Sequence, residues 1–176
     1  MIISLCGFMG TGKSTIGRNL ANYTYSEYVD LDIYIENEYQ YSVQQFFIEY
    51  GEARFREVEY MALKEIITKH QESSNKNLVI SLGGGTIVNK QSAKIIKEQT
   101  FCIYLYSNSE ILIKRLVKNN NKRPLLSGKD GEKIEDTVIK LLKYRDPIYR
   151  DVSQWIIDSQ NLSVKEIVEK ISMVFE

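Results

Sequence analysis

The chain has 176 residues with 43% hydrophobic and 26% charged side chains, and its 23 basic residues balance 23 acidic ones. This length and composition predict one soluble globular domain over residues 1–176, and the balanced charge does not indicate nucleic acid or an anionic membrane as the main partner. No apolar run approaches the roughly 20 residues of a membrane span and no signal peptide is recognised, so we expect a monomeric cytoplasmic protein.

A glycine-rich loop follows the first strand that the sequence predicts. Residues 2–6 are apolar, and residues 7–14 read Gly-Phe-Met-Gly-Thr-Gly-Lys-Ser, the G-x-x-x-x-G-K-S pattern of a phosphate-binding loop. The glycines would let successive backbone N–H groups turn toward one anion. Lys13 would supply a cation for the outer phosphates, Ser14 could offer its hydroxyl to Mg²⁺, and a helix beginning near Ser14 would add its positive dipole end. A chance glycine-rich turn is the alternative, but the strand before the loop and the helical pattern after it favour phosphate binding.

Strand-like and helical segments alternate along the rest of the chain. One expected strand ends at residues 29–32, and three others cover 78–82, 101–106 and 155–157. A short helix is expected from the Ser42-x-x-Gln45 capping box to Gly51, and longer helices over 52–70, 90–98, 110–117 and 132–149, the last of these disturbed by Pro147. A final helix is capped by Ser163-x-x-Glu166, and its inward residues are Val164, Ile167, Val168 and Ile171. The polar residues 118–130 are expected to form a mobile loop.

This alternation predicts an α/β fold in three layers, a five-stranded parallel sheet flanked by helices. Ligands of such folds sit beyond the carboxyl ends of the strands. The glycine-rich loop, the pair Asp30 and Asp32, and the triplet Gly83, Gly84 and Gly85 all follow predicted strands. We therefore expect these residues to meet at one edge of the sheet.

The two cysteines and the single histidine are expected to carry no chemistry. Cys6 and Cys102 each lie within an apolar run, which favours buried free thiols over a disulfide or a metal site. His70 falls at the polar end of a predicted helix, where a solvated side chain is expected. A histidine triad or a zinc site is therefore excluded.

Several polar residues have two interpretations on spacing alone. Asp30 and Asp32 would project to the same side of an extended chain, where one could support Mg²⁺ and the other could accept a proton, or Asp32 could only cap the next helix. Arg56 could face a ligand or form an exposed pair with Glu52 or Glu59.

The remaining candidates follow the same pattern. The glycine triplet could be a plain turn or could let backbone amides approach a ligand. Arg123 could close over phosphates or be solvated, and Arg145, before Asp146-Pro147, has no interpretation by itself.

Taken together, these motifs resemble the shikimate kinase family in order and spacing over nearly the whole chain. The segments of this chain that match the family pattern are the nucleotide loop 7–15, the paired aspartates in Asp30-Leu31-Asp32, Phe55-Arg56, the glycine triplet in residues 81–85, the arginine-bearing lid at Arg123-Pro124-Leu125-Leu126, and Arg145-Asp146-Pro147-Ile148-Tyr149. The resemblance implies a P-loop kinase fold, with a substrate-binding helical segment at about 32–60 and a mobile lid at about 118–130.

The resemblance also implies the reaction, which is transfer of the γ-phosphoryl group of ATP to the 3-hydroxyl of shikimate in aromatic amino acid (chorismate) biosynthesis. The implied nucleotide-binding residues are Gly10, Thr11, Gly12, Lys13, Ser14, Thr15 and Arg123. The implied shikimate-binding residues are Asp32, Arg56, Gly83, Gly84, Gly85 and Arg145. The implied catalytic residues are Asp32, Lys13 and Arg123, and Mg²⁺ is implied at Ser14 and, through water, at Asp30.

Two positions depart from the family pattern. The family often has an arginine that stacks on adenine where this chain has Leu116, with Arg115 beside it. Basic residues that often follow the last strand are replaced by Ser159-Gln160-Asn161.

Three other functions are alternatives to this assignment. A different small-molecule kinase, such as a gluconate or nucleotide kinase, would not need two carboxylate-binding arginines and the glycine triplet. A GTP-dependent switch needs an Asn-Lys-x-Asp motif, and Asn121-Lys122-Arg123-Pro124 lacks the aspartate. A non-catalytic nucleotide-binding module has no support, since Lys13, Ser14, Asp30 and Asp32 are all present.

Overall fold

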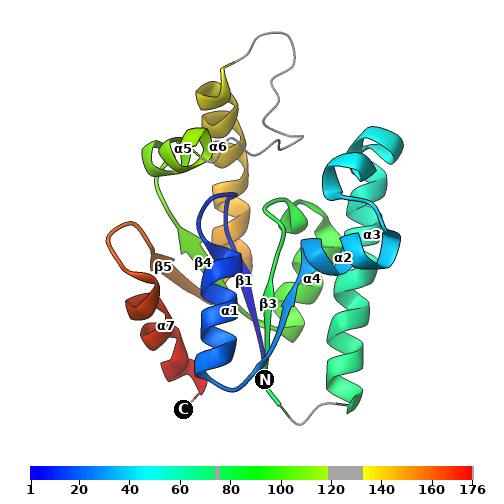
Figure 1. The fold of residues 1–176 in the computed structure, drawn as a ribbon, viewed down its shortest axis with the longest axis vertical. Coiled ribbons are helices and arrows are strands. Elements are labelled where there is room, and N and C mark those ends of the chain that lie inside the picture. The colour runs from blue at the N-terminus through cyan, green and yellow to red at the C-terminus, as the bar shows by residue number, and fades with distance from the viewer. Residues whose placement is uncertain (74–75, 119–132, 176) are drawn as a thin grey trace.

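The computed structural model describes residues 1–73, 76–118 and 133–175. Its centre is a parallel sheet with strand order β2-β3-β1-β4-β5 (Figure 1). The strands are β1 (Ile2–Cys6), β2 (Glu27–Asp30), β3 (Leu78–Ser81), β4 (Phe101–Tyr106) and β5 (Trp155–Asp158). The predicted five-stranded parallel sheet is confirmed.

Helices connect the strands and cover both faces of the sheet. They are α1 (Lys13–Tyr23), α2 (Leu31–Tyr39), α3 (Val43–Ser73), the short 3-10 helix η1 (Thr86–Val88), α4 (Lys90–Gln99), α5 (Ser109–Lys118), α6 (Ile134–Val152), α7 (Val164–Ser172) and the 3-10 helix η3 (Met173–Phe175). Within the described ranges, none of these helices combines the length and hydropathy needed to cross a bilayer.

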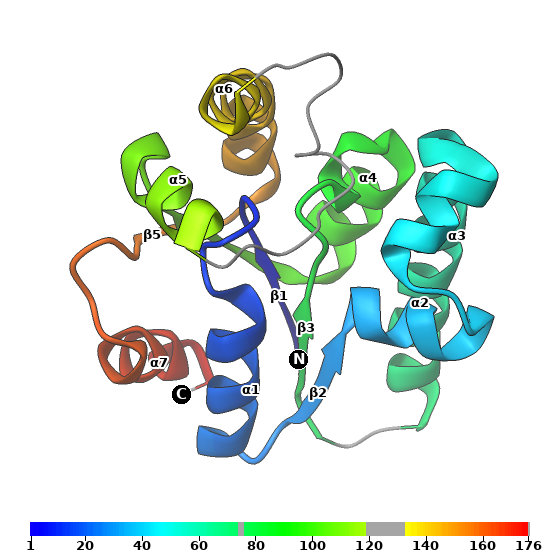
Figure 2. The same cartoon turned by 45° about the horizontal axis from the view of Figure 1, so that its top comes forward.

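Side chains of the central strands alternate between two separate apolar cores. Ile3 and Leu5 of β1 pack with α1 and α7 on one face, whereas Ile2 and Cys6 pack with α3, α4 and α6 on the other (Figure 2). Both faces of a strand are thereby buried, which explains why the central strands read as continuous apolar runs. The three-layer arrangement follows, and Cys6 and Cys102 are buried free thiols as predicted.

The register of the sheet brings the carboxyl ends of three strands to one edge. Leu5 of β1 pairs with Ser81 of β3, and Ser81 in turn pairs with Asp30 of β2. The chain segments that leave these strands are therefore neighbours, as the sequence predicts. They are the glycine-rich loop, the start of α2 and the glycine triplet.

The junction after β2 differs from the expectation. The strand ends at Asp30, whose carboxylate accepts the N–H of Ile33 at 3.4 Å and so caps α2. Asp32 lies in the first turn of that helix, so the expectation of an extended chain through Asp32 was wrong, although both aspartates face the same cavity as predicted. The helix cap that we considered for Asp32 belongs to Asp30.

The helical region that follows α2 bends as predicted. The Ser42 N–H donates to Gln45 Oε1 at 2.9 Å and the Gln45 N–H donates to Ser42 Oγ at 3.2 Å, which confirms the capping box. Gly51 has φ 78° and ψ 167°, so α3 consists of two helical segments that meet at this residue. A positive φ of this kind is readily adopted only by glycine.

Three local expectations need correction. His70 is buried and its Nδ1 lies 3.3 Å from Glu27 Oε2, because the last turns of α3 pack beside the start of β2. Val164 is exposed at the first position of α7, where the helix has not yet met the sheet. Helix α6 contains Pro147 and extends to Val152, beyond the expected end at Tyr149.

The close contact of α1 with the sheet generates a stability prediction at Gly17. A methyl group added there would lie 2.5 Å from Ser81 Oγ and 2.8 Å from Tyr28 Cε2. Helix propensity alone favours Gly17→Ala by about 1 kcal/mol, but we expect overpacking to destabilise the variant by about 1–3 kcal/mol. Urea unfolding measures the change. The exposed Asn22→Ala in the same helix is the control and should lie within about 0.5 kcal/mol of the parent, and a Gly17→Ala protein of parental stability would contradict the packing account.

Candidate active site

A cavity of about 610 Å³ opens at the carboxyl edge of the sheet. It is lined by the glycine-rich loop, the start of α2, both segments of α3, the glycine triplet and one side chain of α6. The predicted site residues that line it are Gly10, Gly12, Lys13, Ser14, Thr15, Asp30, Asp32, Arg56, Gly83, Gly84, Gly85 and Arg145. Arg123 and residues 119–130 of the predicted lid lie outside the described residues.

The glycine-rich loop turns its backbone around the N-terminus of α1. Gly10 and Gly12 have φ of 87° and 93°, values that side chains disfavour. The Lys13 ammonium is buried and donates to the carbonyl oxygens of Gly7 at 2.8 Å and Phe8 at 3.1 Å. Because these carbonyl oxygens face a cation and α1 begins at Lys13, the loop and the helix end together form an anion-binding arrangement.

Two oxygen-bearing side chains lie beside this loop. Ser14 and Asp30 both line the cavity, and the Tyr28 hydroxyl lies 3.1 Å from the Ser14 carbonyl oxygen and 3.4 Å from Asp30 Oδ2. A hydroxyl and a carboxylate are hard oxygen donors of the kind that Mg²⁺ prefers when phosphates supply further ligands. The described residues contain no cluster of three or more His, Cys, Asp or Glu side chains suited to a metal.

Asp32 is the carboxylate whose environment is most altered. Burial in the cavity wall is the main cause that raises its pKa to about 7, and the nearby charges of Glu59 and Asp30 raise it further. Lys13 and Arg56 act in the opposite direction. A carboxyl group with this pKa changes its charge close to neutral pH, which suits a group that accepts a proton.

A buried ion pair lies next to Asp32. Arg56 donates to Glu59 Oε2 at 2.7 Å and to Glu52 Oε1 at 3.0 Å, and Thr86 Oγ1 donates to Glu59 Oε1 at 2.5 Å. Glu59 is fully buried and Arg56 is only 8% exposed. Arg56 therefore pairs with both glutamates that were considered as its partners. The pair with Glu59 is buried at the cavity, whereas the Glu52 side chain is exposed.

The first and third glycines of the triplet have no room for a side chain. A Cβ at Gly83 would lie 2.6 Å from Glu59 Oε1 and 2.8 Å from Asp32 Oδ1, and a Cβ at Gly85 would lie 2.1 Å from Arg56 Nη2. The triplet is thus more than a turn, since its backbone fills the space between the acidic and basic side chains. Its position lets backbone atoms contact a molecule in the cavity.

Arg145 approaches the triplet from α6. Arg145 is 3% exposed, and its Nη1 donates to the Gly84 carbonyl oxygen at 3.2 Å, while its buried Nε has no hydrogen-bond partner among the described residues. The Tyr149 hydroxyl donates to the same carbonyl oxygen. A buried arginine with an unused donor beside a cavity is suited to binding an anionic group.

Sequence reasoning missed part of this site. Glu59 was considered only as a surface partner of Arg56, and its three-residue spacing was the available signal. Tyr149, four residues after Arg145, was noted only as part of a motif. Glu36, whose Oε1 accepts the Val43 N–H at 2.8 Å and joins α2 to α3, gave no signal in the sequence.

Comparisons with known proteins identify relatives of this chain. The family model described as "Shikimate kinase" matches residues 9–176. The chain is similar to a shikimate kinase of Chlorobaculum parvum, with 39% identity over 97% of this chain and 91% of the relative, and to one of Pelotomaculum thermopropionicum, with 37% identity over 96% and 92%.

Solved structures give the same result. Shikimate kinase from Acinetobacter baumannii in complex with shikimate superposes with a TM-score of 0.87 at 32% identity and covers 99% of this chain and 92% of that one. Deoxyadenosine kinase from M. mycoides shares only the fold, with a TM-score of 0.64 at 18% identity over 99% of both chains. The chain thus belongs to the shikimate kinase family, as its motifs predict.

Proposed function

We propose that this protein transfers the γ-phosphoryl group of ATP to the 3-hydroxyl of shikimate, releasing ADP and shikimate 3-phosphate. One observation carries the proposal. A single cavity joins a phosphate-binding loop, an aspartate with a pKa near 7 and two buried arginines. The loop serves the nucleotide, the arginines serve a carboxylate, and the aspartate lies between these two parts.

Phosphoryl transfer depends mainly on positioning and on stabilising negative charge in the transition state. The loop amides, the N-terminus of α1 and the Lys13 ammonium supply positive charge at the phosphates. Ser14 and, through water, Asp30 would hold Mg²⁺, which would neutralise charge on the phosphate oxygens. When the nucleotide binds, the Lys13 ammonium would release the Gly7 and Phe8 carbonyl oxygens and would contact the outer phosphates instead.

Asp32 has the role of orienting the 3-hydroxyl and accepting its proton. Its pKa of about 7 leaves a substantial fraction ionised near neutral pH and keeps the carboxylate basic enough to take a proton. Its place in the first turn of α2 directs it into the cavity beside Gly83.

Arg56 and Arg145 have the role of binding the carboxylate of shikimate. A guanidinium offers paired N–H donors that match a carboxylate. Glu59 holds Arg56 in place, and the Gly84 carbonyl oxygen holds Arg145, so little ordering remains for the substrate to induce. The backbone of the glycine triplet completes the wall between the two arginines.

Some parts of the proposal come from the family resemblance. Arg123, in the segment at about 118–130, is assigned to the phosphates and to closure over the nucleotide, and it stays a prediction because it lies outside the described residues. We also propose a monomer, because one chain supplies every described residue of the site, and a cytoplasmic enzyme, where ATP is available.

The first experiment measures ADP release from Mg-ATP in a coupled assay, with shikimate, gluconate, nucleoside monophosphates or no acceptor. We expect ADP release that requires shikimate, because the two buried arginines would bind its carboxylate while the glycine triplet contacts its ring, whereas gluconate has the carboxylate but no ring. Calorimetry with ATP and circular dichroism verify that the protein is folded and binds nucleotide. Folded, ATP-binding protein that ignores shikimate would contradict the proposal, and turnover with gluconate or a nucleotide would identify another kinase.

Asp32→Asn should lower kcat by about 10²- to 10⁴-fold, while ATP binding is retained, because the amide cannot accept the proton. In the parent, the Asp32 carboxyl has a pKa near 7 in the folded protein and near 4 in the unfolded chain, so its ionisation destabilises the fold. This destabilisation is complete above pH 7 and decreases as the pH falls toward 4. The variant should therefore be more stable at pH 8, by about 2 kcal/mol, and gain less at pH 5.

Turnover and thermal unfolding at both pH values test this prediction. Glu38→Gln, which removes an exposed carboxylate from the same helix, is the matched control and should change neither property. Near-normal turnover of Asp32→Asn would remove Asp32 from the role of base.

Arg56→Ala should raise the KM for shikimate by about 10- to 100-fold and leave the KM for ATP close to that of the parent, since a charge-assisted contact to the carboxylate is lost. The matched control is Arg54→Ala, because Arg54 is two residues away and its ion pair with Glu57 is exposed. Steady-state kinetics with each substrate varied give both values. An unchanged KM and kcat for shikimate in folded Arg56→Ala would refute the carboxylate contact.

A further inference from the structure

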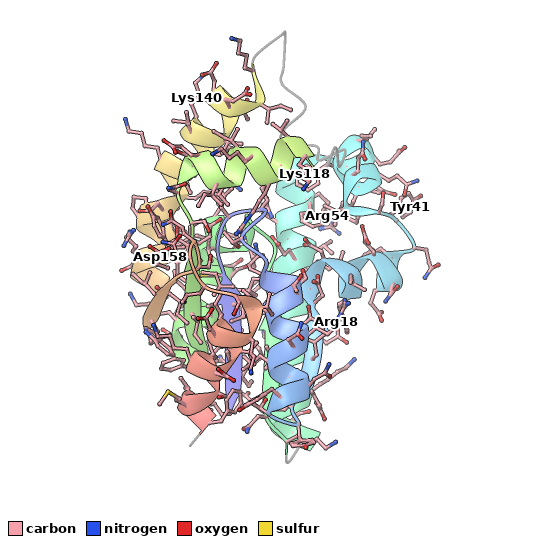
Figure 3. All side chains as sticks on the ribbon, turned by 60° about the vertical axis from the view of Figure 1, so that its left-hand side comes forward. Arg18, Tyr41, Arg54, Lys118, Lys140 and Asp158 are labelled. Atoms are coloured by element: carbon pink, nitrogen blue, oxygen red, sulfur yellow. The ribbon has the colours of Figure 1, made fainter. Side chains whose placement is uncertain are left out.

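Tyr28 of β2 lies between the sheet and the first turns of α1. Its ring is so close to Gly17 that a methyl group added there would meet Cε2 at 2.8 Å. The Arg18 guanidinium carbon, from the same helix, lies 5.9 Å from the centre of the ring (Figure 3). These contacts hold the ring between β2 and α1, so its hydroxyl can reach groups of both elements.

The hydroxyl of Tyr28 has three oxygen neighbours at the carboxyl edge of the sheet. They are the Ser14 carbonyl oxygen at 3.1 Å, Ser81 Oγ at 3.2 Å and Asp30 Oδ2 at 3.4 Å. Ser81 Oγ itself donates to the Lys13 carbonyl oxygen at 3.0 Å. A phenol has a single hydrogen to donate, so one hydroxyl connects the start of α1 with the ends of β2 and β3.

The Asp30 carboxylate is held at both of its oxygens. Oδ1 accepts the Ile33 N–H at 3.4 Å, and Oδ2 accepts the Tyr28 hydroxyl. Tyr28 and Asp30 are two residues apart on one strand and therefore project to the same face of the sheet. The orientation of the carboxylate is thus set by the chain itself, with a helix N–H on one oxygen and a phenol hydroxyl on the other.

This arrangement bears on the ion that Ser14 and Asp30 are proposed to hold. Both residues line the cavity, whereas Tyr28 does not. Mg²⁺ requires near-ideal octahedral geometry, so the spacing and orientation of the groups around it matter. Removing a group that orients the ligands of a metal commonly lowers metal affinity by about 10- to 100-fold. The Tyr28 hydroxyl, which contacts both Asp30 and the Ser14 backbone, is placed to have this effect.

We infer that Tyr28 is a positioning residue for the magnesium site, which acts through the Asp30 carboxylate and the Ser14 backbone. The inference rests on the proposed use of Mg-ATP at the glycine-rich loop. Its consequence is selective. Loss of the hydroxyl weakens binding of the metal ion to the nucleotide complex and leaves the binding of metal-free nucleotide unchanged, since Tyr28 does not line the cavity.

The test is Mn²⁺ binding to the parent, Tyr28→Phe and Tyr25→Phe proteins in complex with ADP, followed by the electron paramagnetic resonance signal of free Mn²⁺. Phenylalanine keeps the ring between β2 and α1 and removes only the oxygen. We expect Tyr28→Phe to raise the Kd for Mn²⁺ by about tenfold. Tyr25 is 89% exposed, so Tyr25→Phe loses a hydroxyl at the surface and should change this Kd by less than about twofold.

Two further measurements separate positioning of the metal from packing of the loop. Calorimetric titration with ADP in the presence of EDTA should give Tyr28→Phe a Kd within about twofold of the parent. The Mg²⁺ concentration for half-maximal turnover should rise by about the same factor as the Kd for Mn²⁺, and kcat should recover at high Mg²⁺.

The alternatives give different results. A Tyr28→Phe protein with the parental Kd for Mn²⁺ would overturn the inference. An equal loss for metal-free ADP would assign Tyr28 to the packing of the loop and would overturn it as well. A parent protein that binds neither ADP nor Mn²⁺ would contradict the proposed function together with the inference. Shikimate is absent from the binding experiments, so their outcome is independent of how the acceptor is recognised.

Discussion

The buried ion pair of Arg56 and Glu59 is the interaction on which the rest of the site depends. Glu59 is fully buried, and its two oxygens accept from Arg56 and Thr86, so it connects α3 with the turn that follows the glycine triplet. A buried charge is tolerated only when it is paired and hydrogen-bonded, and the loss of either partner leaves the other uncompensated. The pair also sets its surroundings, because Glu59 helps to raise the pKa of Asp32 and leaves only glycine room at Gly83.

The parallel sheet supplies the frame in which this pair can act. Since β1, β2 and β3 run in the same direction and in register, the loop for the nucleotide and the wall for the acceptor begin only a few residues beyond one sheet edge. The positive end of α1 and the acidic start of α2 then both border the cavity. Phosphoryl transfer needs a donor and an acceptor aligned at short range, and this arrangement provides the alignment through backbone geometry more than through side chains.

Much of the fold could be predicted because it depends on regular patterns. Apolar runs alternating with helical periodicity predict the parallel sheet, and motif spacing predicts the residues that meet at its edge. Details decided by single contacts were missed. Both Asp30 and Asp32 are suitable helix caps, and a single hydrogen bond shows that Asp30 caps α2. His70 is buried beside Glu27, with which it forms one hydrogen bond. Packing between elements buries Arg56, which the sequence places on a helix surface. Spacing along a helix names the possible partners of Arg56 but cannot say which elements cover it.

The central claim is that two buried arginines select a carboxylate at the acceptor end of the cavity. The most direct test compares the calorimetric affinity of shikimate with that of its carboxamide, which has the same ring and hydroxyls but no charge. The account predicts that the carboxamide binds at least about 100-fold more weakly, because Arg56 and Arg145 lose their charge-assisted hydrogen bonds to the ligand's carboxylate. Equal affinity of the two compounds would contradict it and would show that the arginines are structural and that the acceptor is recognised elsewhere.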